Sequence, residues 1–187
     1  NNIFQPIIRS SIVNANPKDN GHITVYLGHF NTEKIIEILG RITDFKFEIF
    51  CGQAKEISVS RNIKIVPINQ DLFTESLVNS HGIITGAGFE TPAEALYLGK
   101  KVLTIPMKGQ YEQQCNAEAL KEFNVPIIEE FNNSFIAQFR TWMNKNDQKQ
   151  LIITKSTKEI IRTVVEKEEN VFPMVPAGKS VADIRLK

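Results

Sequence analysis

Residues 81–116 read HGIITGAGFETPAEALYLGKKVLTIPMKGQYEQQCN, and this stretch decides the fold class. A short apolar run meets a glycine turn at 86–88. A helical stretch follows and stops at Gly99, and then come a second apolar run at 102–105 and a polar loop that opens another helix. A glycine turn directly before a helix aims backbone N–H groups and a helix N-terminus at one point, which favours an anion. The stretch therefore predicts a β-α-β unit with an anion site at its turn.

The same alternation runs through the rest of the chain. It predicts strands at 22–27, 45–51, 62–66 and 125–128, and helices at about 32–42, 71–78, 113–123, 134–143 and 157–165. Short strands separated by helices are typical of a doubly wound, Rossmann-like α/β domain, here with about six parallel strands and helices on both faces. In such a sheet the loops after the strands share one edge, where ligands bind.

Composition excludes several classes of partner. The chain has 187 residues, 22 basic and 21 acidic side chains and a net charge of +1, so it has no long-range attraction for nucleic acid. No apolar run approaches the roughly 20 residues of a membrane helix. Cys51 and Cys115 lack metal-type spacing, so we expect a reducing, cytoplasmic compartment, no metal and no cofactor.

The first residues predict a chain that continues a preceding domain. They include no Met and no signal peptide, and residues 1–21 are polar and turn-rich. We therefore expect an interdomain linker over 1–21, a ligand-binding domain over 22–168 and a C-terminal tail over 169–187.

Thr91 and Glu94 admit two interpretations. Thr91-Pro92-Ala93-Glu94 has the pattern of a capping box with proline at the first helical position. Alternatively, Thr91 contacts a phosphate and Glu94 accepts two hydrogen bonds from a ribose diol. From these four residues alone, the capping box is the favoured interpretation.

The second loop adds groups suited to a sugar. Glu112, Gln113 and Asn116 offer acceptors and donors for vicinal hydroxyls, although Glu112 is also an acid favoured in any first helical turn.

His29 follows the first strand, where it either donates to a phosphate or is an exposed loop residue. NAD is disfavoured because the glycine turn follows the fourth strand and no acid ends the next one. A phosphate site beside a polyol site predicts a nucleotide-sugar.

Residues 82–106 and 109–117 resemble the donor-binding half of GT-B glycosyltransferases. The likeness is greatest to the bacterial peptidoglycan N-acetylglucosaminyltransferase type and the UDP-glucuronosyltransferase type. Their pattern is roughly His-Gly-Gly, a Ser or Thr, Glu-Ala, Gly, Pro, then Asp/Glu-Gln and Asn-Ala. Two residues depart from it, because Thr85 stands in place of the usual histidine and Ala87 in place of a glycine.

The resemblance implies a role for each candidate residue, with no catalytic residue among them. The diphosphate would be bound by Gly86, Ala87, Gly88 and Thr91, with Phe89 in the same turn, and the loop of Gly28 and His29 would close over it. The backbone near Ile68 would meet the base, Glu94 the ribose, and Glu112 and Gln113, with Asn116 beside them, the sugar hydroxyls.

The resemblance also implies what the chain lacks. The acceptor and the catalytic base belong to an N-terminal, acceptor-binding domain of the same chain, through which any peripheral membrane contact would be made. The donor would be a UDP-sugar carrying a hexose, used without a metal. Alternatives are half of a UDP-sugar epimerase or hydrolase, and a non-catalytic nucleotide-sugar-binding subunit.

Overall fold

The computed structural model describes residues 5–171, which fall into two units. The larger unit spans Ile8–Ile152, and the smaller one comprises residues 5–7 and 153–171. The predicted tail over 169–187 lies outside the described residues from 172 onward. Within the described part, no helix has the length and apolar character needed to cross a membrane.

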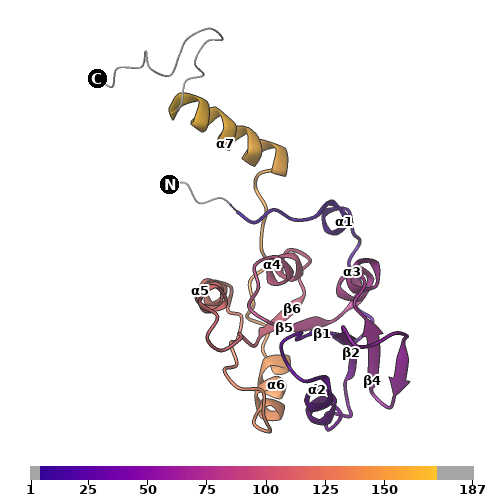
Figure 1. Cartoon of the computed structure of the whole chain (residues 1–187). Helices are drawn as coiled ribbons and strands as arrows, with labels where there is room; N and C mark the ends of the chain where they lie inside the picture. Colours follow the sequence, from indigo (N-terminus) through magenta and orange to yellow (C-terminus); the bar gives the residue numbers. More distant parts are fainter. Residues whose placement is uncertain (1–4, 172–187) are drawn as a thin grey trace. The chain divides into compact units, whose positions relative to one another are not determined.

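The larger unit is built on one six-stranded sheet (Figure 1). The strand order is β3-β4-β2-β1-β5-β6, and every neighbouring pair is parallel except β3 and β4. This arrangement confirms the predicted doubly wound α/β fold. The strands are β1 (His22–Tyr26), β2 (Lys46–Cys51), β3 (Ser58–Ser60), β4 (Ile63–Pro67), β5 (Gly82–Thr85) and β6 (Lys101–Thr104).

Helices cover both faces of this sheet. Figure 1 shows α3 and α4 on one side and α2 and α6 on the other. The helices of the larger unit are α1 (Ser10–Val13), α2 (Thr32–Leu39), α3 (Gln70–Asn79), α4 (Glu90–Tyr97), α5 (Tyr111–Leu120), the 3₁₀ turn η1 (Lys121–Phe123) and α6 (Phe135–Asn144). The smaller unit contains α7 (Thr157–Val171).

Three elements differ from expectation. Residues 125–128 do not form a full strand, because only Ile127 makes a bridge, to Thr104. The sixth strand is instead β3, which runs antiparallel to β4 at the opposite edge of the sheet. All three of its residues are exposed, so no pattern of apolar residues predicts it. The short α1 lies inside the segment that the sequence suggested was a linker.

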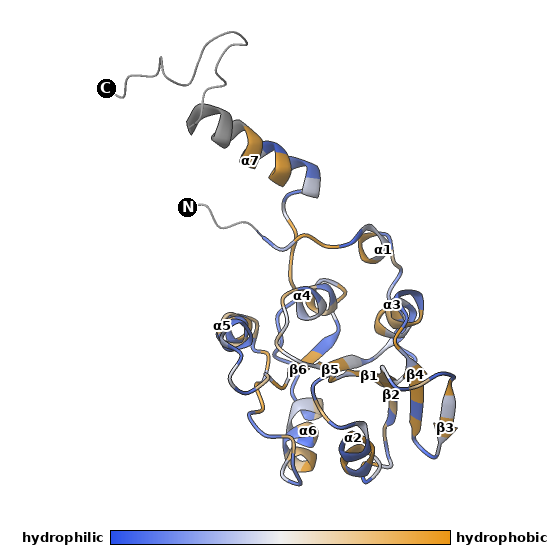
Figure 2. Cartoon of the chain, viewed as in Figure 1, coloured by the Kyte–Doolittle hydropathy of each residue, from blue (hydrophilic) through white to orange (hydrophobic). Residues whose placement is uncertain are grey.

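The core fills the space between the sheet and its helices. Strands β1, β2, β5 and β6 contribute fully or nearly fully buried aliphatic residues, and Figure 2 shows apolar character along these strands. On the face covered by α2 and α6, aromatic rings dominate, and Phe47, Phe135 and Phe139 are at most 1% exposed. Burial of this kind supplies the main favourable free energy of folding.

The strand register brings three loops side by side. Tyr26, the last residue of β1, pairs with Thr85, the last residue of β5, and Thr85 pairs with Thr104, the last residue of β6. Gly82 permits the close β5–β6 approach, since a Cβ there would lie 2.7 Å from the Lys101 carbonyl oxygen. The chain therefore leaves β1, β5 and β6 at the same level on one edge of the sheet.

Candidate functional site

The carboxyl edge of the sheet brings together the residues that were predicted to form one site. The loop after β1 carries Gly28 and His29, the loop after β5 carries the glycine turn, and the loop after β6 leads into α5. A Cβ placed on Gly86 would lie 3.2 Å from Gln113 Oε1 and 3.4 Å from His29 Cε1. The loop after β1 and the first turn of α5 thus converge on Gly86.

Two side chains of α5 make hydrogen bonds to the neighbouring loops, one to the loop after β6 and one to the glycine turn. Gln113 Oε1 accepts a hydrogen bond from the Met107 backbone N–H at 2.9 Å, and Asn116 Nδ2 donates to the Ala87 carbonyl oxygen at 3.1 Å. Ala87 is itself fully buried. Gln113 and Asn116 therefore hold α5 in position at the candidate site.

His29 is not the exposed loop residue that one alternative predicted. Its ring lies against Phe30, with ring centroids 4.4 Å apart, and its Nε2 atom is buried without a hydrogen-bond partner among the described residues. Burial lowers the pKa of His29, and a hydrogen bond with the Ile105 backbone only partly opposes this, so the ring is neutral at pH 7. A buried polar atom without a partner, next to Gly86, is a group that a ligand can satisfy.

Glu94 has a partner that the sequence did not suggest. Arg9 Nε donates to Glu94 Oε1 at 2.6 Å, and Arg9 Nη2 donates to Oε2 at 2.5 Å. The Glu94 side chain is 3% exposed and that of Arg9 is 32% exposed. The hydrogen bonds to Glu94 raise the pKa of Arg9, with its burial opposing.

The capping box predicted for Thr91 and Glu94 is wrong. Helix α4 begins at Glu90, so Pro92 is not its first residue, and no side chain makes a capping hydrogen bond at Phe89. Because Glu94 turns to Arg9, it does not reach back to the helix start. The first N–H groups of α4 thus lack a side-chain acceptor.

The remaining predicted residues are accessible at the same edge. Ile68 follows β4, and Phe89 lies in the glycine turn; these side chains are 53% and 57% exposed. Glu112 is exposed in the first turn of α5, and Thr91 is half-buried in α4. Tyr111, 79% exposed beside Glu112, was not predicted, and an exposed aromatic at a helix start gives no sequence signal of its own.

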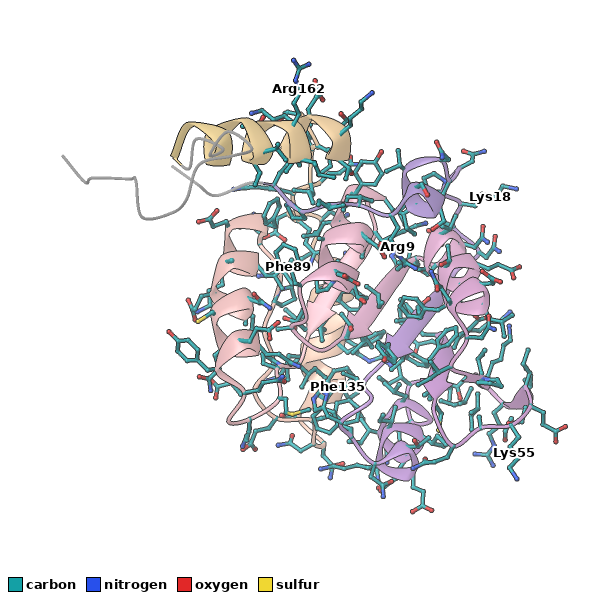
Figure 3. All side chains as sticks on the ribbon, turned by 45° about the horizontal axis from the view of Figure 1, so that its top comes forward. Arg9, Lys18, Lys55, Phe89, Phe135 and Arg162 are labelled. Carbon is teal, nitrogen blue, oxygen red and sulfur yellow. The ribbon has the colours of Figure 1, made fainter. Side chains whose placement is uncertain are left out.

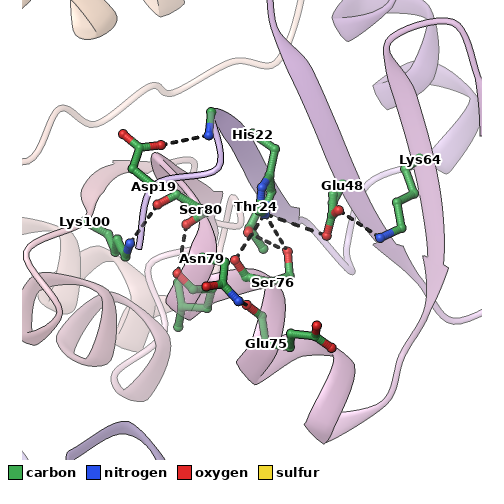
Figure 4. Close-up of polar contacts among 12 residues, drawn as sticks. Asp19, His22, Thr24, Glu48, Lys64, Glu75, Ser76, Asn79, Ser80 and Lys100 are labelled. Carbon is green, nitrogen blue, oxygen red and sulfur yellow. Dashed lines mark hydrogen bonds and ion pairs between the residues drawn. The ribbon is translucent and has the colours of Figure 1, made fainter. Parts of the chain in front are cut away.

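A second polar cluster lies on the α3 side of the sheet (Figure 4). His22 Nε2 is 3.2 Å from Ser76 Oγ and 3.7 Å from Glu48 Oε2, and Ser76 Oγ also lies 2.8 Å from Thr24 Oγ1. A catalytic triad needs the serine and the carboxylate on different ring nitrogens, whereas both face the same one here. Lys64 pairs with Glu48 at 2.9 Å, so the cluster is a satisfied structural network beside an open cavity of about 570 Å³.

No group of three or more His, Cys, Asp or Glu side chains that suits a metal ion occurs within residues 5–171. The titratable groups at the carboxyl edge are spread over separate loops, with Glu94 already paired to Arg9. What the edge offers is a set of N–H donors, amides and one unpartnered imidazole nitrogen.

Comparisons with known proteins show the family and the fold of this chain. The family model described as Glycosyl transferase family 1 matches residues 1–143. No curated protein matches the sequence significantly. Among solved structures, the glycosyltransferase SnogD from Streptomyces nogalater is similar with a TM-score of 0.53 and 18% identity, over 88% of this chain and 43% of that one.

Two further structures share the fold. MurG from Acinetobacter baumannii is similar with a TM-score of 0.51 and 18% identity, over 74% of this chain and 45% of that one. The glycosyltransferase VinC, solved in complex with dTDP, is similar with a TM-score of 0.53 and 15% identity, over 76% of this chain and 38% of that one. The chain therefore spans less than half the length of each of these three proteins. By its family match and its architecture, the chain belongs to glycosyl transferase family 1 and has the fold of a GT-B domain.

Proposed function

We propose that this chain is the nucleotide-sugar-binding domain of a glycosyltransferase that moves a hexose from a UDP-sugar to an acceptor. The acceptor and the catalytic base would be held by a second domain, since the relatives are more than twice as long as the part this chain matches. The chain's own residues would bind the donor and stabilise the departing nucleoside diphosphate.

The observation that supports this proposal best is the meeting of His29, Gly86 and Gln113 at the start of α4. The glycine turn and the uncapped N-terminus of α4 offer backbone N–H groups to a phosphate. A Cβ on Gly88 would find no atom within 4 Å, so the turn is open on that side. An anion can therefore approach the backbone closely.

The chemistry of donor binding follows from these groups. Negative charge develops on the diphosphate as the glycosidic bond to the sugar breaks, and fixed N–H dipoles stabilise that charge without rearranging. In the proposed pose Glu112 and Gln113 bind the sugar hydroxyls, the backbone at Ile68 binds the base, and Glu94 binds the ribose. The dTDP held by VinC supports a nucleoside diphosphate as the ligand class.

A thermal-shift panel of UDP, dTDP, GDP, CDP and ADP tests this function. At a concentration near 100 times its Kd, a ligand stabilises the protein by about 2.7 kcal/mol. For a chain of this size that corresponds to a rise in Tm of roughly 5 to 10 °C. We expect the largest rise with UDP. If no nucleoside diphosphate raises the Tm, the proposal is contradicted. If a nucleoside diphosphate with another base gives the largest rise in Tm, the donor carries that base instead of uracil.

A further inference from the structure

The ion pair between Arg9 and Glu94 joins the start of the larger unit's sequence to helix α4. The residues are 85 positions apart, and both guanidinium contacts are short and charge-assisted. Arg9 is the residue before α1, and Ile12 of that helix is fully buried. Figure 3 shows Arg9 lying beside α4.

This pair occupies both oxygens of the carboxylate that the proposed function gives to the ribose. Each oxygen accepts one hydrogen bond from Arg9, and the side chain as a whole is 3% exposed. Because the guanidinium pairs with an almost fully buried carboxylate, a ribose diol would have to displace it to bind both oxygens. The Arg9 side chain, in contrast, is about one-third exposed and has a path to solvent.

We propose that Arg9 is a built-in competitor of the donor's ribose for Glu94. The inference rests on the proposed function. In the empty protein Arg9 neutralises a carboxylate that would otherwise be buried and unpaired, which is costly. When the nucleotide binds, the 2′- and 3′-hydroxyls take over the two oxygens and the guanidinium swings outward. Ile12 keeps α1 in place during this exchange, so only a side chain has to move.

The competition predicts an increase in affinity when Arg9 is removed. Part of the binding free energy of UDP is spent on breaking the ion pair, although water recovers part of that cost when the one-third-exposed guanidinium leaves. Arg9→Ala should therefore bind UDP about tenfold more tightly than the natural sequence. Arg9→Gln, which keeps one donor to Glu94, should fall between them. Arg41→Ala is the matched control, because Arg41 pairs with Glu37 on the surface of α2 and should leave the Kd unchanged.

Two further ligands separate this inference from the proposed function. Inorganic pyrophosphate probes the glycine turn alone, so its affinity should not rise in Arg9→Ala. The 2′-deoxy form of UDP offers one hydroxyl fewer to Glu94 and should bind more weakly than UDP in every variant. Calorimetric titration measures all of these affinities, with circular dichroism confirming that each variant is folded.

Each outcome decides a separate point. If UDP and its 2′-deoxy form differ but Arg9→Ala and Arg9→Gln bind UDP no more tightly, the competition is refuted while the donor site stands. Weaker binding of both UDP and pyrophosphate in Arg9→Ala would make Arg9 a phosphate ligand and overturn the inference. If no variant binds any nucleotide, the proposed function itself fails. Should Arg9→Ala not fold, Arg9→Gln decides alone.

Discussion

At the residue scale, the candidate site depends on contacts that single side chains make across loops. Gly86 and His29 come from two loops and Gln113 from α5, and the sequence predicted all three residues for this edge. It did not predict that Gln113 accepts from the Met107 backbone or that His29 Nε2 is buried without a partner. Such details depend on the distance between loops, which a linear pattern does not contain.

Replacing Gly86 by alanine should disturb the site through Gln113. The new Cβ would lie 3.2 Å from Gln113 Oε1 and displace the amide from its bond to Met107, at a cost of about 1 kcal/mol in the free energy of unfolding. Gly88→Ala is the matched control, since its Cβ meets no atom within 4 Å, and its effect should be within about 0.5 kcal/mol. Urea unfolding measures both, and equal losses would refute the role of Gln113.

At the element scale, the aromatic face of α6 holds the helix to the sheet. Phe139 is fully buried, and its ring centroid lies 5.1 Å from that of Phe45, 5.6 Å from Phe47 and 5.5 Å from Trp142. The amphipathic pattern of 134–143 predicted this helix, because apolar residues recur on one helical face. The pattern failed for β3, whose three exposed residues present no buried face.

Phe139→Ala should therefore be strongly destabilising. Removing a fully buried ring from a packed aromatic cluster costs about 3 to 5 kcal/mol in the free energy of unfolding. Phe89→Ala removes the same side chain from a position that is 57% exposed and should cost less than about 0.5 kcal/mol. Denaturant midpoints compare the two variants. A loss below about 1 kcal/mol for Phe139→Ala would show that α6 is not needed for the core.

At the scale of the whole molecule, the polar network around His22 joins β1, β2, β4 and α3. His22 contacts Ser76, faces Glu48, and lies in the electric field of Lys64 and Lys100. Burial lowers the pKa of His22 from its ordinary 6.5, while Glu48 and Ser76 oppose the shift. His22 is therefore a buried structural histidine.

This network should make stability depend on pH. Because the pKa of His22 is lower in the folded state than in the unfolded state, the unfolded chain takes up the proton first as pH falls below 6.5. Stability is thus complete above about pH 7 and declines toward about pH 5.5. The His22→Asn variant should lose part of this decline. Urea unfolding at the two pH values tests the idea, and an unchanged pH dependence in the variant would contradict it.

The sequence by itself determined the order and type of most of the elements, and it predicted an anion site at the glycine turn. Short apolar runs, helical periodicity and a glycine turn are local signals. They depend on residues close together in the chain, so they can be recognised from the sequence. Only the tertiary structure decided that Glu94 pairs with Arg9 instead of capping its own helix. The two residues are 85 positions apart, and a carboxylate's partner is set by the path of the folded chain, which brings Arg9 to α4 within one unit.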